Sequence, residues 1–412
     1  MENSLKTAIE LMELENKYGA HNYHPLPVVL DRGEGVFVWD VDGNRYFDFL
    51  SAYSAVNQGH CHPEIVYALV EQATTLTLTS RAFYNSQLGK YEEYVTRYFG
   101  YDKVLPMNTG AEAVETAIKI CRKWSYEKKG LTENSAQIVV CENNFHGRTT
   151  TIVSFSADPE AYNNYGPFTP GFIAIPYNDA AAFEKILAGN KNIAGFLVEP
   201  IQGEAGVFVP DDGYLKKCYD LCQKYNVLFL ADEVQTGIAR TGKLLACDYE
   251  DVHPDILILG KALSGGVYPV SAVLASNEIM DVIQPGQHGS TFGGNPVAAT
   301  VAVAALEVIR DEKLAENAFH LGQIFRYEIQ KMCESSNVAS FVRGKGLLNA
   351  MVINNEGYKD LAWDICLKLM ENGLLAKPTH TNIIRFAPPL VITENQLHLC
   401  VGIIKRTIKQ FE

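Results

Sequence analysis

Basic residues are in short supply in this sequence of 412 residues, where 35 lysines and arginines stand against 48 aspartates and glutamates. The net charge is -13 at pH 7, and the pI is about 5.3. A chain with this excess of negative charge presents no overall positive field to a phosphate backbone or to an anionic bilayer. The composition therefore argues against nucleic acids and membrane surfaces as partners.

Long apolar runs and targeting segments are also missing. The longest stretch without a charged residue, 282–306, is broken in its first half by prolines and glycines, so it predicts a loop followed by a buried helix instead of a membrane span. The first 19 residues contain glutamates but no arginine, and they match neither a secretory signal nor a transit peptide. We expect a cytoplasmic protein, and a mitochondrial one only if a presequence has been removed.

Cysteines and histidines at metal-ligand spacing are scarce. The nine cysteines are scattered and mostly lie in apolar stretches, which is typical of reduced thiols in a cytosol-like compartment. Cys218 and Cys222 have no second pair that would complete a zinc site, and we interpret them as helix residues. Adjacent ligands such as His60, Cys61 and His62 cannot all face one ion from a regular strand. We therefore expect a structural loop there, and no metal.

The order of the predicted elements indicates an α/β fold. Apolar runs of four to six residues alternate with helix-length segments at 103–107, 138–141, 194–198, 227–231, 256–259 and 271–275. Such runs are typical of a mostly parallel sheet that is covered by helices on both faces. Turn residues between short runs at 25–50 predict a small antiparallel meander, and a helix is expected from Pro296 with Asn295 as its cap.

The flanks of this central region predict a second, smaller α+β domain that both ends of the chain build together. We place its two parts at 1–58 and 311–412, with the large domain at 59–310. No internal repeat or linker of low complexity marks these boundaries, so they follow from the order of the elements alone.

Two polar side chains stand where predicted strands end. Asp232 follows the run at 227–231, and Lys261 follows the run at 256–259 after one glycine. In open α/β sheets ligands collect at the carboxyl ends of the strands, so this carboxylate and this amine are candidates for one site. A structural salt bridge at the sheet edge explains the same spacing equally well.

A loop that leads into a helix offers a place for a phosphate. Thr109, Gly110 and Ala111 follow a predicted strand and open a helix, whose first amides and dipole favour an anion. A second loop, which contains Ser290 and Thr291, adds hydroxyl and amide donors. A phosphate site, an acid and a lysine together match what pyridoxal phosphate (PLP) requires, whereas the G-x-G-x-x-G fingerprint of a nicotinamide enzyme is not found.

Several motifs resemble those of class III, fold type I PLP-dependent aminotransferases: LADEVQTG at 230–237, LGKALSGG at 259–266 and HGSTFGGNP at 288–296. Within the class, the motifs YGAHNYHP at 18–25, SAYSAVNQGH at 51–60 and VEPIQGEAG at 198–206 are similar to those of the ornithine δ-aminotransferase group. The resemblance covers nearly the whole chain. It implies transfer of an amino group from ornithine to 2-oxoglutarate. The alternatives are an N-acetylornithine or 4-aminobutyrate aminotransferase and, from another class, a non-catalytic PLP-binding protein.

The resemblance also implies how individual residues bind the cofactor. Lys261 would form the Schiff base, and Asp232 would pair with the pyridine nitrogen. Further contacts would come from Gln235 at the ring hydroxyl, from Phe145 on the ring face, and from the amides of Gly110 and Ala111 at the phosphate. Thr291 of the other subunit would reach the same phosphate, so the resemblance implies a homodimer with shared active sites. Position 146 holds histidine, where animal enzymes of the group tend to have tryptophan.

The substrate residues follow from a geometric problem. Ornithine presents a bare CH2–NH3+ group to the cofactor, whereas 2-oxoglutarate places a carboxylate beside its reacting carbon, so one cation near the cofactor has to be silenced for ornithine. Arginine suits this post because its planar fork binds a carboxylate through two hydrogen bonds. By the resemblance, Arg385 is this proximal cation, Glu204 neutralises it, and Arg148 is a permanent distal clamp. Tyr23 would bind the α-amino group of ornithine, and Tyr53 would shape the pocket. Exposed ion pairs without a role are the alternative for the charged residues.

Overall fold

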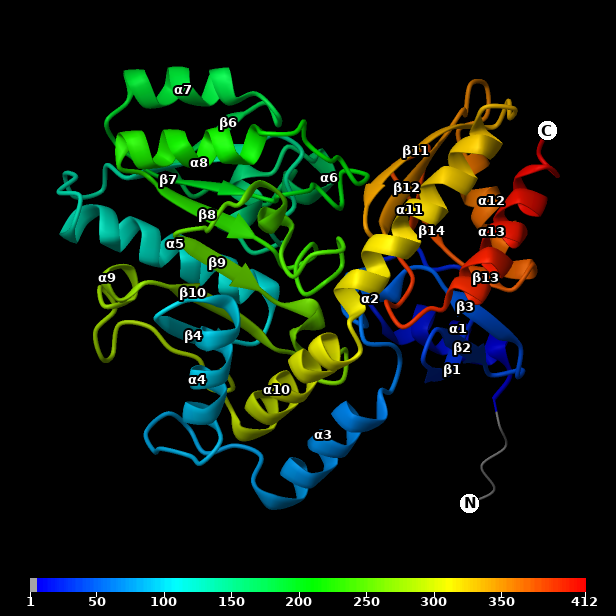
Figure 1. Cartoon of the computed structure of the whole chain (residues 1–412), viewed down its shortest axis with the longest axis horizontal. Coiled ribbons are helices and arrows are strands. Elements are labelled where there is room, and N and C mark those ends of the chain that lie inside the picture. The colour runs from blue at the N-terminus through cyan, green and yellow to red at the C-terminus, as the bar shows by residue number, and fades with distance from the viewer. Residues whose placement is uncertain (1–5) are drawn as a thin grey trace.

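A seven-stranded sheet forms the centre of the large domain. The computed structural model, which describes residues 6–412, gives the strand order β4-β10-β9-β8-β7-β5-β6 (Figure 1). The strands are β4 (Lys103–Met107), β5 (Gln137–Cys141), β6 (Phe172–Ile175), β7 (Ile193–Val198), β8 (Leu228–Asp232), β9 (Ile256–Leu259) and β10 (Ser271–Ala275). All neighbouring pairs except the two that involve β10 are parallel, so the predicted mostly parallel sheet is confirmed.

Two details of this sheet differ from the pattern of the sequence. The chain between β9 and β10 holds only residues 260–270, which is too short for the crossover that parallel neighbours need. Strand β10 therefore returns antiparallel beside β9, with Ala272 opposite Leu259. The edge strand β6 was not among the predicted runs, because it is short and lies between Gly171 and Pro176 in a stretch rich in turn residues.

Alternate side chains of the strands pack against helices on opposite faces of the sheet. Ile138 and Val140 of β5 pack in one core with α5 (Gly110–Glu127). Val139 and Cys141 pack in a second core with α7 (Ala180–Gly189) and α8 (Tyr214–Tyr225). This period of two places a helix layer on each side of the sheet (Figure 1), so the expected cover of both faces is confirmed.

A further group of helices packs on the large domain: α3 (Pro63–Thr75), α4 (Leu88–Phe99) and α10 (Pro296–Asp311). Helix α10 begins at Pro296 as predicted, and the Asn295 side chain accepts a hydrogen bond from the Ala298 amide at 2.9 Å. Short helical turns complete the domain: η1 (Ile152–Phe155), α6 (Pro159–Tyr162), η2 (Ala246–Glu250), η3 (Lys261–Ser264) and α9 (Asn277–Met280). Across residues 6–412, none of the helices combines the length and the apolar character that crossing a bilayer requires.

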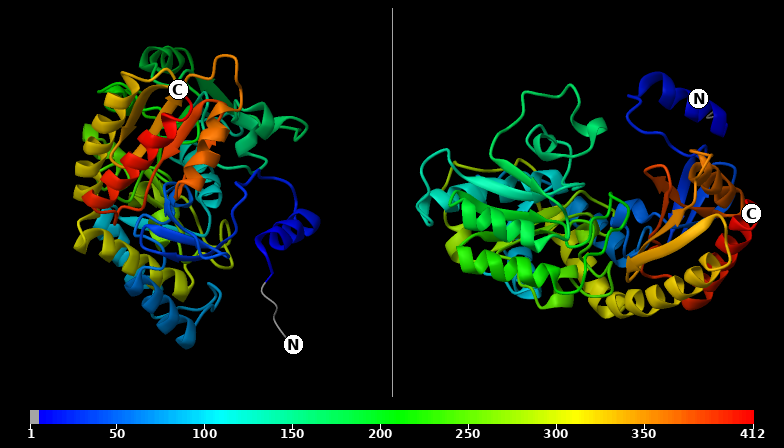
Figure 2. Two further views of the ribbon diagram at one scale, coloured as in Figure 1. Left: turned by 90° about the vertical axis from the view of Figure 1, so that its right-hand side faces the viewer. Right: turned by 90° about the horizontal axis from the view of Figure 1, so that it is seen from above.

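Both ends of the chain contribute to the small domain. The predicted meander is present as β1 (Leu30–Glu34), β2 (Phe37–Asp40) and β3 (Arg45–Asp48), and β13 (Leu374–Leu375) joins it in parallel beside β3. A second, antiparallel sheet has the order β11 (Ala339–Lys345), β12 (Leu348–Ile353), β15 (Ile383–Phe386) and β14 (Lys377–Thr379). The helices are α1 (Ala8–Tyr18), α2 (Ser51–Ser54), α11 (Leu314–Cys333), α12 (Leu361–Glu371) and α13 (Glu394–Ile408). Helix α1 stands away from the rest of the chain (Figure 2) and has no buried residue.

Arg240 links the large domain to both parts of the small one. Its side chain is fully buried, and its guanidinium donates hydrogen bonds to the Asn57 side chain at 3.0 Å and to the carbonyl oxygens of Leu347 and Pro388 at 3.0 and 2.7 Å. Asn57 belongs to the N-terminal segment, whereas Leu347 and Pro388 belong to the C-terminal part of the chain. Burial lowers the pKa of Arg240 to about 9, so the buried charge depends on these acceptors.

We predict that Arg240→Met lowers the free energy of unfolding by about 3 kcal/mol, because the change leaves the carbonyl groups of Leu347 and Pro388 without their donor. Urea unfolding followed by circular dichroism measures the effect. Arg310→Met is the matched control, since Arg310 makes an exposed ion pair with Asp311 and its loss should leave the transition in place. An equal loss in the free energy of unfolding for the two variants would contradict the role given to Arg240.

Candidate active site

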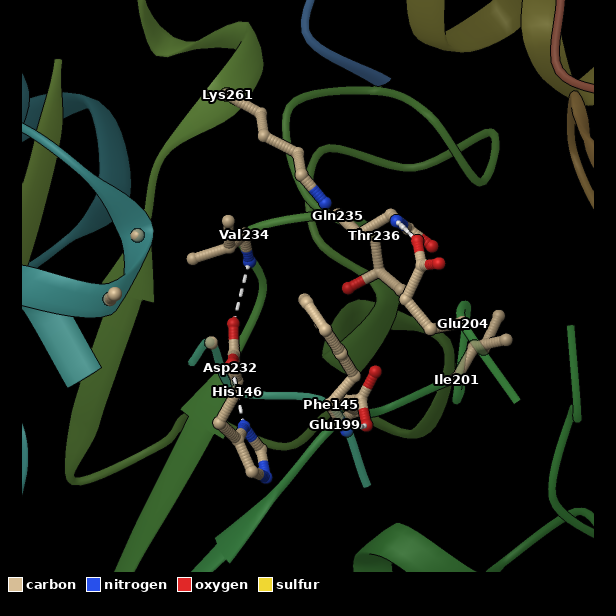
Figure 3. A pocket seen from close by; sticks show the side chains of 13 residues that line it. Phe145, His146, Glu199, Ile201, Glu204, Asp232, Val234, Gln235, Thr236 and Lys261 are labelled. Atoms are coloured by element: carbon tan, nitrogen blue, oxygen red, sulfur yellow. Dashed lines mark hydrogen bonds and ion pairs between the residues drawn. The ribbon is translucent and has the colours of Figure 1, made fainter. Parts of the chain in front are cut away.

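The carboxyl ends of β8 and β9 meet at one edge of the sheet, as the sequence predicts. Asp232 is the last residue of β8 and pairs with Ile258 of β9, and Lys261 follows β9 after Gly260. Both side chains line a cavity of about 200 Å³ (Figure 3). The other predicted residues in its lining are Gly110, Ala111, Phe145, Glu204 and Gln235.

Asp232 is held by a histidine and a backbone amide. The carboxyl group is buried, and it accepts hydrogen bonds from Nδ1 of His146 at 2.6 Å and from the Val234 amide at 3.1 Å. Burial by itself would lower the pKa of His146, but the hydrogen bond to Asp232 and the charge of that carboxylate raise it. The ion-pair partner of Asp232 is therefore His146, and the salt bridge to Lys261 that the spacing also allowed is not formed.

Lys261 projects into the cavity from a strained turn. Its backbone has a φ of 44°, a left-handed conformation that costs free energy in any residue other than glycine. The Nζ atom points toward Gln235 and Thr236 (Figure 3). Burial lowers the pKa of the Lys261 amine, and the carboxylates of Glu204 and Asp232 oppose this shift. A lowered pKa increases the share of neutral amine, which is the form that attacks a carbonyl carbon.

The start of α5 offers backbone amides to the cavity. Thr109 caps this helix: its Oγ1 accepts from the Glu112 amide at 3.2 Å, and its own amide donates to the Glu112 carboxylate at 2.9 Å. The amides of Gly110 and Ala111 come before the first amide that can reach an intrahelical acceptor, so they suit an anion. Gly110 also has to lack a side chain, because a Cβ atom would lie 2.9 Å from Cγ1 of Val234.

Ser290 and Thr291 lie outside the lining of this cavity. The Ser290 Oγ accepts a hydrogen bond from the Asn108 side chain at 2.8 Å, directly before the start of α5. Thr291 is exposed on the surface of the chain. Within one chain, the loop at 288–296 therefore supports the start of α5. The contact expected of Thr291 joins two subunits and stays a prediction.

An ion pair between Glu204 and Arg385 lies beside the cavity. The Nη1 of Arg385 donates to Oε1 of Glu204 at 2.6 Å, and the Nε2 of Gln235 donates to the same oxygen at 3.0 Å. Burial alone would raise the pKa of Glu204, but the charge and the hydrogen bond of Arg385 lower it to about 2. Both groups are therefore charged at neutral pH and neutralise each other. Gly203 leaves room for this arrangement, because a Cβ atom there would lie 1.5 Å from Oε1 of Gln235.

Tyr53 packs against Arg385, the partner of Glu204. The guanidinium carbon of Arg385 is 4.9 Å from the centroid of the Tyr53 ring. Burial raises the pKa of the Tyr53 hydroxyl, which also feels the charges of Arg385, Glu204, Tyr23 and Arg148. Tyr23 and Arg148 are exposed. Of the five predicted substrate residues, only Glu204 belongs to the cavity lining itself.

Two buried ionisable residues of the cavity, His146 and Glu199, were not among the predicted site residues. The Oε2 of Glu199 accepts from the Phe145 amide at 2.9 Å, and burial raises the pKa of Glu199 to about 7. Glu199 directly follows β7, so the rule that singled out Asp232 at the end of β8 also applies to it. The other unpredicted lining residues are Gly147, Ile201, Val234 and Thr236.

The residues of the cavity fit PLP. Lys261 supplies an amine for an aldehyde, Asp232 supplies a buried carboxylate for a pyridine nitrogen, and the start of α5 supplies amides for a phosphate. Within the described chain, the Oε1 of Gln235 is buried without a hydrogen-bond partner, so it is available to a polar group in the cavity. An α/β fold with this site defines a PLP-dependent enzyme of fold type I.

Comparison with known proteins identifies the family. The chain matches aminotransferase class-III over residues 18–408 and belongs to this family. It is 64% identical over 394 residues to the mitochondrial ornithine aminotransferase of Drosophila melanogaster, which covers 96% of this chain and 90% of the fly protein. The protein is thus a transaminase that uses PLP.

Solved structures of similar proteins agree with this assignment. The fold superimposes with a TM-score of 0.91 on acetylornithine aminotransferase from Elizabethkingia anophelis, at 66% identity and with 98% of this chain and 100% of that one covered. The TM-score to ornithine aminotransferase from Toxoplasma gondii ME49 is 0.97, at 49% identity and with 99% and 96% covered. The predicted class of fold is therefore confirmed.

The raised pKa of Glu199 predicts a pH-dependent contribution to stability. The folded protein binds this proton more tightly than the unfolded chain, so the contribution is complete below about pH 4.5 and is lost as the pH rises through about 7. Glu199→Gln should therefore lose less stability between pH 5 and pH 8 than the parent protein, by about 1 to 3 kcal/mol. Urea unfolding of the cofactor-free protein at both pH values measures this, with the exposed Glu142→Gln as control; equal losses in the parent and in Glu199→Gln would refute it.

Proposed function

We propose that the protein transfers the δ-amino group of L-ornithine to 2-oxoglutarate. The products are glutamate and glutamate 5-semialdehyde, which cyclises to pyrroline-5-carboxylate, so the reaction belongs to arginine and proline metabolism. The observation that carries the proposal is the ion pair of Glu204 and Arg385 beside the cavity. A δ-transaminase needs a cation at this place that is neutralised for one substrate and available for the other. The 64% identity to the fly ornithine aminotransferase supports the same conclusion.

Lys261 and Asp232 perform the chemistry at the cofactor. PLP, when bound, supplies an electron sink that allows the C–H bond beside the substrate nitrogen to ionise. Lys261 would hold the cofactor covalently, and its freed amine would move a proton at the substrate carbon. Asp232, fixed by His146, would keep the pyridine nitrogen protonated. The strand tips of β8 and β9 therefore supply both groups on which turnover depends.

The remaining cofactor residues hold the ring and the phosphate. Gln235 would bind the ring hydroxyl, Phe145 would stack on the ring, and the amides of Gly110 and Ala111 would bind the phosphate. Thr109 and Ser290 fix the start of α5. None of these residues needs to change its charge during turnover. Their role is to keep the cofactor in one orientation while Lys261 acts.

Two arginines distinguish the ends of the substrates. Arg148, whose guanidinium carbon lies 5.3 Å from the centroid of the Phe145 ring, binds the carboxylate that is distant from the reacting carbon in both substrates. Once Glu204 has released Arg385, this arginine binds the α-carboxylate of 2-oxoglutarate. While ornithine is bound, Glu204 keeps Arg385 neutralised, Tyr23 binds the α-amino group, and Tyr53 packs against Arg385.

The active sites are shared in a homodimer under this proposal, since Thr291 is exposed in one chain and reaches the phosphate of the other. Helix α1 supports an assembly, because it buries no residue in the single chain, and Ile9 and Tyr18 on it are 65% and 75% exposed. Sedimentation velocity measures the oligomeric state directly, and a monomer with full activity would overturn the shared site.

We also propose a reducing, cytoplasmic location, which the nine unpaired cysteines support.

N-acetylornithine is the second candidate donor, because the chain is 66% identical to a protein named acetylornithine aminotransferase. The two donors differ at the α-nitrogen, which is a charged ammonium in ornithine and a neutral amide in the acetylated compound. Turnover of ornithine, N-acetylornithine and 4-aminobutyrate, each with 2-oxoglutarate, separates the candidates. Ornithine should give the highest kcat/KM, and a higher value for either of the others would replace the proposed donor. A holoenzyme that binds PLP without converting any of the donors would mean a non-catalytic role.

Lys261→Ala should remove both the covalent attachment of PLP and turnover, because no other amine in the cavity lining replaces it. Borohydride reduction followed by mass spectrometry shows whether the cofactor is attached to the chain. Lys405→Ala, which changes a lysine on α13 that is paired with Glu328, should retain both properties. PLP that is still attached to the Lys261→Ala protein would place the reactive lysine elsewhere.

Glu204→Gln should shift the preference of the first half-reaction from ornithine toward glutamate. Without its carboxylate partner, Arg385 attracts an α-carboxylate, and one charge-assisted contact of this kind corresponds to about one to two orders of magnitude in the ratio of rates. Single-turnover rates with each donor measure that ratio. Arg148→Ala is the contrast, because the distal clamp serves both donors and its loss should slow both. An unchanged ratio in Glu204→Gln would remove the switch from the proposal.

A further inference from the structure

Strand β14 contacts two of the substrate residues, Arg385 and Glu204, and the neighbour of a third, Tyr23. None of its own residues was predicted for the site. It pairs antiparallel with β15, and Lys377 lies opposite Arg385 in the register. The two cations are therefore cross-strand neighbours. Burial lowers the pKa of Lys377, and the charge of Arg385 contributes to the shift. The strand is therefore next to Arg385, whose charge has to be neutralised while ornithine is bound.

Lys377 also fixes the segment that carries Tyr23. Its Nζ donates a hydrogen bond to the carbonyl oxygen of His24 at 2.6 Å. The His24 ring stacks on the Trp363 ring of α12, with the centroids 4.2 Å apart and an angle of 7° between the planes. Within residues 6–412, the hydrogen bond from Lys377 to His24 is the one that joins the segment 19–28 to a distant part of the chain. The other hydrogen bonds of this segment are local.

Tyr23 depends on this anchor because its own surroundings do not hold it. The segment between α1 and β1 has no helix or strand, and the Tyr23 side chain is 63% exposed. An exposed tyrosine in an irregular segment has many available orientations, and each contact with a substrate has to repay the entropy of ordering it. Fixing the neighbouring residue at its carbonyl group and at its ring reduces that cost.

Thr379, two residues further along β14, fixes the other partner of the switch. Its Oγ1 donates a hydrogen bond to the backbone carbonyl oxygen of Glu204 at 2.9 Å. The Glu204 carboxylate contacts Arg385 and Gln235, so the backbone contact sets where the side chain begins while leaving the carboxylate free to move. Through Lys377 and Thr379, β14 therefore holds two segments that are far apart in the sequence.

We propose that β14 is a positioning strand for substrate discrimination, in which Lys377 sets Tyr23 and Thr379 sets Glu204 relative to Arg385. The inference rests on the proposed function, since it uses ornithine and 2-oxoglutarate as the two substrates to be told apart. Lys377 and Thr379 are positioning residues, because they act through Tyr23 and Glu204 without touching substrate or cofactor themselves.

Lys377→Met in the PLP-loaded enzyme tests the first half of the proposal. Loss of one anchoring hydrogen bond should raise the KM for ornithine about five- to tenfold, while kcat and the KM for 2-oxoglutarate stay within about twofold. Lys377→Arg keeps a donor and should restore the KM for ornithine. Trp363→Leu weakens the same anchor from its other side and should give the same split. If both anchor variants left the KM for ornithine unchanged, or raised both KM values equally, Lys377 would not position Tyr23.

Thr379→Val tests the second half with a different measurement. The valine lacks the hydroxyl group, so the single-turnover ratio of glutamate to ornithine should rise about three- to tenfold, whereas Thr379→Ser should retain the parent ratio. Lys405→Met is the control for a general loss of stability in the small domain, and it should change neither ratio nor KM. An unaltered ratio in Thr379→Val would separate β14 from the switch.

The same assays tell the two levels of the argument apart. If the parent enzyme does not convert ornithine, the proposed function fails before any variant is made. If it converts ornithine and the variants of Lys377 and Thr379 behave like the parent, the function stands and the positioning role of β14 is wrong.

Discussion

A buried guanidinium needs acceptors on every side, and the contact between the two domains depends on how Arg240 finds them. The side chain extends from the large domain and is bound by Asn57 from one end of the chain and by carbonyl groups of the other end. Because Pro388 lies three residues after Arg385, the same contact limits where β15 can lie. Strand tips of the large domain therefore line the cavity, and an arginine of the small domain lies beside it.

Local patterns in the sequence were sufficient to predict most strands of the central sheet. Apolar runs predicted the strands that deliver Asp232 and Lys261, because a buried parallel strand has to be apolar throughout and ligands collect at its carboxyl end. Glu199 at the end of β7 obeys the same rule. Strand β10 shows what an apolar run cannot predict, namely whether a strand runs parallel or antiparallel to its neighbour. Here the antiparallel direction follows from the short connection between β9 and β10.

The contacts between distant segments could not be predicted from local patterns. Nothing in the letters around Lys377 indicates that its amine reaches the carbonyl group of His24, since that contact joins the two ends of the chain. The contact between Asp232 and His146 is of the same kind. The sequence shows a histidine at position 146, but the direction of its ring depends on how β5 and β8 lie in the sheet. The roles of Arg385 and Glu204 came from resemblance alone, and their proximity is a property of the fold.

Gly203 has an evolutionary consequence. A single added methyl group there would occupy the position of the Gln235 amide oxygen, and Gln235 shares Glu204 with Arg385. Every one-nucleotide change of a glycine codon to that of another amino acid introduces at least a Cβ atom, so each such change displaces the end of the Gln235 side chain from its present position. The exposed residues Tyr23 and Arg148 meet less steric resistance to single substitutions, so a change of amino donor that begins at either of them leaves Gln235 and its contact with Glu204 in place.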